Sequence, residues 1–127
     1  MRLLLDSHVF LWWVGADPAL PRRARAAIAD ADNECFLSHA SVWEMAIKAS
    51  LGKLKLPVSV ERFVAEQCEL NDIRFLSITL AHVVAVERLP FHHRDPFDRL
   101  LVVQARYEGM ALISHDPSLK LYGVPVI

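Results

Sequence analysis

The sequence predicts a single α/β domain built on a mostly parallel sheet of four to five strands. Short apolar runs alternate with longer segments of helical periodicity along the whole chain. The 127 residues are 54% hydrophobic and 23% charged, which suits one sizeable core and excludes a disordered chain. No repeat, low-complexity tract or linker interrupts this pattern, so residues 1–127 are expected to form one domain.

The charge and cysteine content narrow the class of protein. The net charge of −1 gives no support for broad electrostatic binding of nucleic acid, and it leaves a small local site open. Cys35 and Cys68 lie in apolar segments without metal-ligand spacing, so we expect core thiols in a reducing compartment. No signal segment opens the chain, and no apolar run approaches the roughly 20 residues of a membrane span. We therefore expect a cytoplasmic protein that does not bind membranes.

The first part of the chain predicts one strand followed by two helices. Residues 2–6 form a short apolar run that ends in an acid, and residues 7–14 are helical and very apolar. A Gly-Ala-Asp-Pro turn at residues 15–18 precedes a helix over residues 21–31 that is rich in Ala and Arg.

The middle of the chain repeats this order of elements. A second strand over residues 34–38 leads into a helix over residues 39–51, which Gly52 ends. Residues 53–57 alternate in polarity and are expected to be exposed. Each of the next two helices begins at a hydroxyl cap, and one strand lies between them. The expected elements are a helix from Ser59 to about residue 70, a strand over residues 73–78 and a helix from Thr79 through residue 89.

The motif at residues 93–101 opens the last helix. Asp95 is expected at the N-cap, Pro96 at the first helical position and Asp98 at the third. The Asp98 carboxylate then lies at the positive end of a helix, where an ionised acid is stabilised. The helix is expected to run to about residue 108 and to stop at Gly109. A fourth strand is predicted after it over residues 111–114, and residues 124–127 could add a fifth.

Four acids that are far apart in the sequence are predicted to meet at one edge of the sheet. Asp6 ends the first strand, and Asp116 follows the fourth strand by two residues. Asp98 opens the helix that leads into the fourth strand, and Glu44 lies within two turns of the second strand. Because ligands bind at the carboxyl ends of parallel strands, this edge is the expected site.

The chemistry of such a cluster predicts a divalent cation. Carboxylates that are packed together repel one another and raise each other's pKa, so the cluster costs stability without a cation. One or two Mg²⁺ or Mn²⁺ ions would neutralise it, activate water and hold a phosphate oxygen. The expected ligands are all oxygen, without a plausible Cys or His set, which favours Mg²⁺ or Mn²⁺ over Zn²⁺.

Each acid also has an ordinary structural interpretation. Asp6 and Asp95 could cap helices, and Asp95 is interpreted first as a cap. Glu44 has a lysine four residues later, which is the usual surface ion pair. Asp98 could favour the helix dipole, and Asp116 precedes a proline as many turn acids do. The functional interpretation therefore depends on all four acids together.

Hydroxyl, imidazole and indole side chains lie near these acids. Ser7, Ser41 and Ser114 could orient carboxylates or metal-bound waters, or could simply cap helices and turns. The histidines, which include His92, His93 and His115, are interpreted as solvated ahead of phosphate contacts. The tryptophans are interpreted as core or interface residues ahead of base-stacking platforms.

The chain resembles a PIN domain, and more narrowly a VapC-type toxin of a toxin–antitoxin pair. The resemblance covers nearly the whole chain and lies in several separated motifs in the same order, at residues 4–13, 38–48, 52–54, 93–101, 104–105 and 112–116. It implies a three-layer α/β/α sandwich and a ribonuclease that depends on Mg²⁺ or Mn²⁺.

The resemblance also implies roles for individual residues. Asp6, Glu44, Asp98 and Asp116 match the family's acidic cluster, with Asp6 and Asp98 as the most direct metal ligands. Ser7 and Ser114 match the small hydroxyls beside it, and Asp95 matches a position typical of this subgroup.

The expected partners are RNA, a second copy of the chain in a homodimer, and a cognate antitoxin, which could assemble with the homodimer into a larger complex. The antitoxin would combine a DNA-binding portion with a segment that covers the site. The apolar residues 10–13 and the surface near residues 21–28 could receive it, or could be ordinary core.

Several functions remain open at this stage. Candidates for stabilising charge on the phosphate are Lys48, Arg94 and Arg99, each with a solvated-surface interpretation ahead of it.

The chain could instead be another metal-dependent nuclease that acts on DNA, although it is short for the extra acids and helical insertion of such enzymes. A receiver-like module needs an acid pair and a lysine that are missing here. A binder that has lost catalysis is disfavoured by the four intact acids.

Overall fold

A computed structural model describes residues 1–127 and contains one sheet of four parallel strands in the order β3-β2-β1-β4. The strands are β1 (Arg2–Leu5), β2 (Glu34–Ser38), β3 (Ile73–Leu76) and β4 (Ala111–Ile113). The α-helices are α1 (Ser7–Val14), α2 (Arg22–Ala29), α3 (His39–Ser50), α4 (Val60–Leu70), α5 (Leu80–Ala85) and α6 (Pro96–Glu108). Two 3₁₀ helices complete the fold, η1 (Val86–Arg88) and η2 (Pro117–Tyr122). The predicted α/β class is confirmed.

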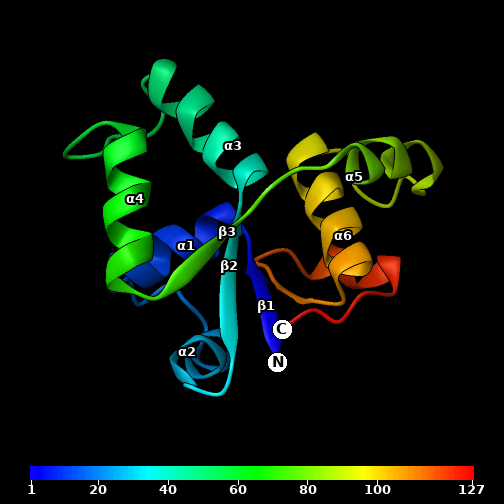
Figure 1. The fold of residues 1–127 in the computed structure, drawn as a ribbon, viewed down its shortest axis with the longest axis horizontal. Helices are drawn as coiled ribbons and strands as arrows, with labels where there is room; N and C mark the ends of the chain where they lie inside the picture. Colours follow the sequence, from blue (N-terminus) through cyan, green and yellow to red (C-terminus); the bar gives the residue numbers. More distant parts are fainter.

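Alternation along the strands separates two apolar layers. Leu3 and Leu5 of β1 pack with residues of α1, α2 and α4 on one face of the sheet. Leu4 points to the opposite face and packs with α6 and η2. Figure 1 shows the sheet nearly edge-on, with α1, α2 and α4 to its left and α5 and α6 to its right. This is the three-layer arrangement that the sequence predicts.

The strand order reverses at β1. The chain adds β2 and β3 on one side of β1, and then crosses through α5, η1 and α6 to place β4 on the other side. In the parallel register, Leu5 pairs with Leu37 of β2 and with Ile113 of β4. The segments that follow β1 and β4 therefore lie next to each other at the carboxyl edge, where α/β sheets bind ligands.

Helix caps place the predicted acids at this edge. The Asp95 carboxylate accepts hydrogen bonds from the N–H groups of Phe97 at 2.8 Å and Asp98 at 3.2 Å, and Pro96 is the first helical residue. The helix ends at Gly109, whose φ of 65° is in the left-handed region that favours glycine. The expected start and end of α6 are both confirmed.

Three elements differ from the sequence prediction. The helix expected through residue 89 becomes 3₁₀ after Ala85, and Leu89 is extended with ψ of 128°, because Pro90 disfavours a helical conformation before it. The expected fifth strand is reduced to one bridge between Leu112 and Val126, which adds no strand to the sheet. The helix η2 was not predicted, although Pro117 follows an acid that caps it.

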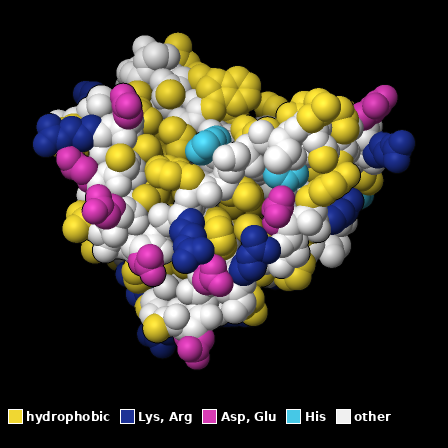
Figure 2. All heavy atoms as spheres, viewed as in Figure 1, with side chains coloured by type: hydrophobic (Ala, Val, Ile, Leu, Met, Phe, Trp, Pro, Cys, Tyr) yellow, Lys and Arg dark blue, Asp and Glu magenta, His cyan; other side chains and the backbone are white.

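The surface carries mixed charge and several exposed apolar side chains. Figure 2 shows Lys and Arg intermixed with Asp and Glu, and apolar side chains gathered over α3, α4 and the β3 edge. The large apolar side chains that are most exposed on α3, β3 and α5 are Trp43, Phe75, Leu80, Val83 and Val84. In contrast, Phe10, Ala24 and Ile28 are buried, so much of the apolar surface expected on α1 and α2 is core.

The remaining compositional expectations concern the thiols and membrane spans. Both cysteines are free and buried, and burial raises the pKa of each thiol to about 11. None of the helices combines the length and the apolar character that crossing a bilayer would require.

Candidate metal centre

A polar cavity of about 170 Å³ lies at the carboxyl edge of the sheet, and none of the side chains that line it is hydrophobic. Its lining combines acids, histidines, a serine and a lysine, namely Asp6, Ser7, His8, Glu44, Lys48, His93, Asp95, Asp98, His115 and Asp116. The structure thus brings together all four acids of the predicted cluster, together with Asp95 and Ser7. Ser114 is not part of this lining and lines a neighbouring hollow beside α2.

Asp6 is almost fully buried at the end of β1 and caps α1. Its Oδ1 accepts a hydrogen bond of 2.8 Å from the Val9 N–H. Its Oδ2 accepts two more from His115, one of 3.0 Å from the backbone N–H and one of 2.7 Å from Nδ1. Burial acts to raise the pKa of Asp6, but the bonds from His115 and Val9 outweigh it and the pKa is lowered. Asp6 is therefore held as a carboxylate. It caps α1, which was one of the two interpretations of this residue, the other being metal binding.

Glu44 is buried on α3 and is held by two partners. Ser7 Oγ donates a hydrogen bond of 2.6 Å to Oε1, and Lys48 Nζ lies 2.9 Å from Oε2. The expected ion pair with Lys48 is thus present, but the carboxylate is buried, so it is not an ordinary surface pair. The third hydroxyl near this site, Ser41 Oγ, is buried without a hydrogen-bond partner.

Asp98 lies in the first turn of α6, and its side chain is only 13% exposed. Burial, and then the nearby carboxylates of Asp95 and Asp6, raise the pKa of Asp98 to about 6, although His93 partly offsets this effect. Repulsion among the acids, which the sequence predicts, therefore adds to burial in opposing the ionisation of Asp98.

Asp116 follows β4 and caps η2. Its Oδ1 accepts a hydrogen bond of 2.9 Å from the Ser118 N–H, and hydrogen bonding to Ser118 lowers its pKa. Ser114 Oγ accepts a hydrogen bond of 3.0 Å from the Asp116 N–H and so shapes the turn. The two interpretations left open for Ser114, turn former and support of an acid, apply together here.

Three histidines, His8, His93 and His115, belong to the site, which corrects their interpretation as solvated side chains, whereas His92 is exposed as expected. His93 Nε2 lies 3.0 Å from Asp98 Oδ2 and 2.8 Å from Asp116 Oδ2. His115 is bonded to Asp6, and this bond is the main cause of its raised pKa. His8 packs on His115 with 4.2 Å between ring centroids, and its pKa is lowered by burial and then by His115. The sequence could have indicated this, because each of these histidines lies within two residues of an acid that the sequence predicts at the site.

Arg99 does not face the cavity, which removes it as a candidate phosphate contact. It is buried, and its guanidinium lies 4.0 Å from the centroid of the Phe91 ring. It donates hydrogen bonds to the carbonyls of Pro90, at 2.8 Å, and Leu89, at 3.1 Å. Its role is to hold the loop before α6, so the solvated-surface interpretation was also wrong. Arg94, by contrast, is exposed as expected.

The donor set fits a divalent cation. His93, Asp98 and Asp116 each offer one ligand atom, and these three atoms lie within 4.8 Å of one another. His93 Nε2 is buried and has no hydrogen-bond partner, and the pKa of Asp98 is raised by burial and then by the carboxylates of Asp95 and Asp6. A cation would satisfy both. The expected oxygen-only donor set stays a prediction, and an imidazole nitrogen lies within reach of the same position.

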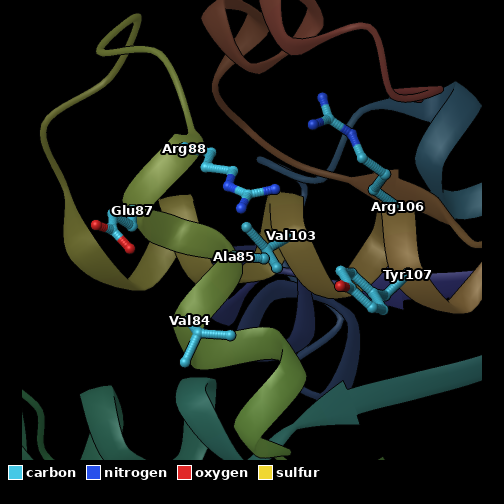
Figure 3. A pocket seen from close by; sticks show the side chains of 7 residues that line it. All are labelled: Val84, Ala85, Glu87, Arg88, Val103, Arg106 and Tyr107. Atoms are coloured by element: carbon cyan, nitrogen blue, oxygen red, sulfur yellow. The ribbon is translucent and has the colours of Figure 1, made fainter.

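A larger hollow of about 390 Å³ lies elsewhere, between α5, η1 and α6. Figure 3 shows Arg88 extending over Val103 and Ala85, with Arg106 and Tyr107 on α6 and Glu87 directed away from Arg88. Its lining contains a single acid, so it lacks the donors that a divalent cation needs. Size alone therefore does not identify the chemical site.

Comparisons with known proteins point to one family. Residues 3–124 match the family described as PIN domain. The chain is 31% identical over 124 residues to Ribonuclease VapC22 of Mycobacterium tuberculosis, covering 97% of this chain and 93% of that protein.

Solved structures share the fold at low sequence identity. VapBC2 from Rickettsia felis, bound to a DNA fragment from its promoter, aligns with a TM-score of 0.71 and 11% identity, covering 100% of this chain and 98% of that chain. FitAcB from Neisseria gonorrhoeae aligns with a TM-score of 0.66 and 18% identity, covering 98% of this chain and 96% of that chain.

Proposed function

Because this chain belongs to the PIN-domain family, we propose that it is a metal-dependent endoribonuclease and the toxin of a toxin–antitoxin pair. The observation that carries the proposal is the convergence of Asp6, Glu44, Asp98 and Asp116 on one polar cavity. The similarity to a ribonuclease over nearly the whole length of both chains supports the same activity.

Asp6, Glu44, Asp98 and Asp116 would hold the cation, which we propose to be Mg²⁺ or Mn²⁺. Once bound, such a cation lowers the pKa of a coordinated water and offsets the charge of a phosphodiester. Asp98 is the acid whose pKa is raised, to about 6, so binding of a cation beside this carboxyl would favour its ionised form. His115 and Val9 fix the orientation of Asp6 through both of its carboxylate oxygens.

Glu44 and Lys48 would form the opposite wall of the reaction site. Ser7 and Lys48 hold the two Glu44 oxygens, so this side chain is fixed in orientation before substrate arrives. The Lys48 side chain is 40% exposed at the cavity and could offset charge that develops on the phosphate. Attack by water would leave a 5′-phosphate and a 3′-hydroxyl.

A protein partner is part of the proposal. Similar structures are VapBC and FitAB complexes, which supports a cognate antitoxin. We also propose a homodimer of this chain within such a complex. A hollow of about 420 Å³ between α3, α4 and β3 is lined mostly by apolar side chains, including Val42, Val64 and Phe75. This surface and the apolar side chains gathered around it in Figure 2 could be covered in the complex.

The test is cleavage by the purified chain without antitoxin. We expect it to cut single-stranded RNA with Mg²⁺ or Mn²⁺, and not with EDTA, and to leave flap DNA intact. Asp6→Ala and Asp98→Ala should lose nearly all activity while circular dichroism shows that the fold persists. Sequencing the RNA ends checks for the 5′-phosphate. Full activity in either variant, or preferential cleavage of DNA, would contradict the proposal.

A further inference from the structure

We infer that His93 Nε2 is a direct ligand of the divalent cation, beside Asp98 and Asp116. The inference relies on the proposed function only for the presence of a cation in this cavity. It adds one nitrogen to a donor set otherwise made of carboxylate oxygens, and it places that nitrogen on the loop before α6.

The distances among the three donor atoms match those of one coordination sphere. In an octahedron with bonds of about 2.1 Å, adjacent ligand atoms are about 3.0 Å apart. His93 Nε2 lies 3.0 Å from Asp98 Oδ2 and 2.8 Å from Asp116 Oδ2. These two distances are those of adjacent ligands, and all three atoms lie within 4.8 Å of one another, so a single ion between them would be in reach of each.

The direction of the imidazole supports ligation over hydrogen bonding. His93 Nε2 is buried, and neither carboxylate oxygen is placed to accept a hydrogen bond from it in spite of the short distances. Adjacent ligands of an octahedral ion have this arrangement, because each oxygen lies about 45° away from the axis between nitrogen and metal.

The rest of the residue is anchored for such a role. The His93 N–H donates a hydrogen bond of 2.9 Å to the Tyr122 hydroxyl, and the His93 carbonyl accepts one of 3.3 Å from Arg99 Nη1. Arg99 therefore has a use within the site although it does not line the cavity: it holds the backbone that presents the imidazole.

One contact must change when the ion binds. His93 Nδ1 accepts a hydrogen bond from the Asp95 N–H, at 3.3 Å, and ligation through Nε2 requires the ring proton to be on Nδ1. This hydrogen bond is longer than usual and correspondingly weak, so a bond between metal and imidazole outweighs its loss.

An imidazole ligand changes the choice of metal. Mg²⁺ prefers oxygen donors, whereas imidazole nitrogen strengthens the binding of transition-metal ions. The affinity for Mn²⁺ relative to Mg²⁺ should therefore depend on His93, and the four acids should still bind Mg²⁺ when this ring is removed.

The decisive measurement is electron spin echo modulation of Mn²⁺ added to the unmodified protein, which detects the nitrogen of a bound imidazole. We expect a nitrogen coupling in wild type and in His92→Ala, and its loss in His93→Ala. His92 is the matched control, since it is exposed, packs on Tyr122 and does not line the cavity. Calorimetric titration should show Mn²⁺ affinity lowered about tenfold or more in His93→Ala, with a smaller loss for Mg²⁺.

Three results would overturn the inference, and each can be separated from failure of the proposed function. These are a wild-type spectrum without nitrogen coupling, a coupling that persists in His93→Ala and disappears in His115→Ala, and equal losses of Mn²⁺ and Mg²⁺ affinity. If any of them occurs while the protein still cuts RNA, the function stands and the ligand assignment is wrong. A nitrogen coupling in a protein that cuts no RNA supports the ligand and contradicts the function.

Discussion

Ser7 Oγ donates a hydrogen bond of 2.6 Å to Glu44 Oε1, which joins the first residue of α1 to the second turn of α3. The two residues follow different strands, and both are buried. The position of the Glu44 carboxylate in the site therefore depends on how α1, which follows β1, lies relative to α3, which follows β2. Lys48 holds the other oxygen of the same carboxylate from one helical turn away.

Ser7→Ala should weaken both the fold and the activity. It removes a buried donor and leaves Glu44 with one partner fewer, which should lower the free energy of unfolding by about 1–3 kcal/mol. Metal-dependent cleavage should fall as well, because Glu44 loses its fixed orientation. Urea unfolding and RNA cleavage measure the two effects. Ser50→Ala is the control, since Ser50 is a serine on α3 that bonds only to the Ile47 carbonyl at the surface. Equal effects of the two substitutions would contradict this account.

Asp98→Asn should stabilise the metal-free protein above about pH 6. The pKa of Asp98 is raised from 3.8 to about 6 by burial and then by Asp95 and Asp6, so the folded state binds more protons than the unfolded chain between these values. The free energy of unfolding therefore falls as pH rises through this interval, and the full penalty, a few kcal/mol, remains above it. Thermal unfolding in EDTA at several pH values measures this dependence.

Comparison with Asp98→Asn separates the pH dependence of stability caused by Asp98 from the pH dependence caused by Asp6 and His115. Asp6 has a lowered pKa, so its contribution is lost only as pH falls below about 4. His115 has a raised pKa, so its contribution is complete below about pH 6.5 and is lost as pH rises beyond that. The difference between wild type and Asp98→Asn should thus grow from about pH 4 to pH 6. A flat difference over this range would show that the Asp98 pKa is not raised.

Added Mn²⁺ should raise the unfolding temperature of wild type, and EDTA should reverse the effect. Binding to the folded state alone contributes about 2.7 kcal/mol when the free ion is about 100 times its Kd. Asp98→Asn should respond much less, although it is more stable without metal. Differential scanning fluorimetry over a series of Mn²⁺ concentrations tests whether the variant is more stable than wild type without metal and gains less stability when metal is added. An equal response of both proteins would mean that the ion binds elsewhere.

Arg99→Ala should destabilise the fold strongly, whereas Arg94→Ala should leave it nearly unchanged. Removal of the buried guanidinium leaves the Pro90 and Leu89 carbonyls without a donor, and we expect a loss of about 3 kcal/mol or more. Arg99→Lys should not rescue the fold, because one ammonium cannot reproduce the spread of donors. Chemical denaturation compares the three variants. Normal stability of Arg99→Ala with reduced RNA binding would restore a role on the substrate.

The local part of the site could be predicted from the sequence. Asp95, Pro96 and Gly109 follow rules of helix ends that need only a few neighbouring residues, and α6 begins and ends where those rules place it. Asp6 and Asp98 could be assigned to one edge because parallel topology fixes that edge. Their catalytic and metal-binding roles remain predictions.

The rest of the site depends on contacts between distant segments. The position of His93 is set by Tyr122 and Arg99, and neither contact has a signal in local periodicity. Arg99 itself was misjudged because an arginine next to an acid at a helix start is usually solvated, and its burial follows from the carbonyls of a loop that lacks regular structure. A fifth strand does not form, because the single bridge between Leu112 and Val126 does not extend into a ladder of paired residues.

The pairing of β1 with β4 matters for when the site can exist during synthesis. Leu3 pairs with Ala111, so the last strand must leave the ribosome before the first strand gains its second neighbour. Glu44 and Asp6 emerge early, whereas Asp98 and Asp116 lie in the final third of the chain. Contacts of such large sequence separation form late and slowly. A nascent or truncated chain that lacks β4 therefore cannot assemble the cavity, so the proposed cutting activity would begin only after β4 has left the ribosome.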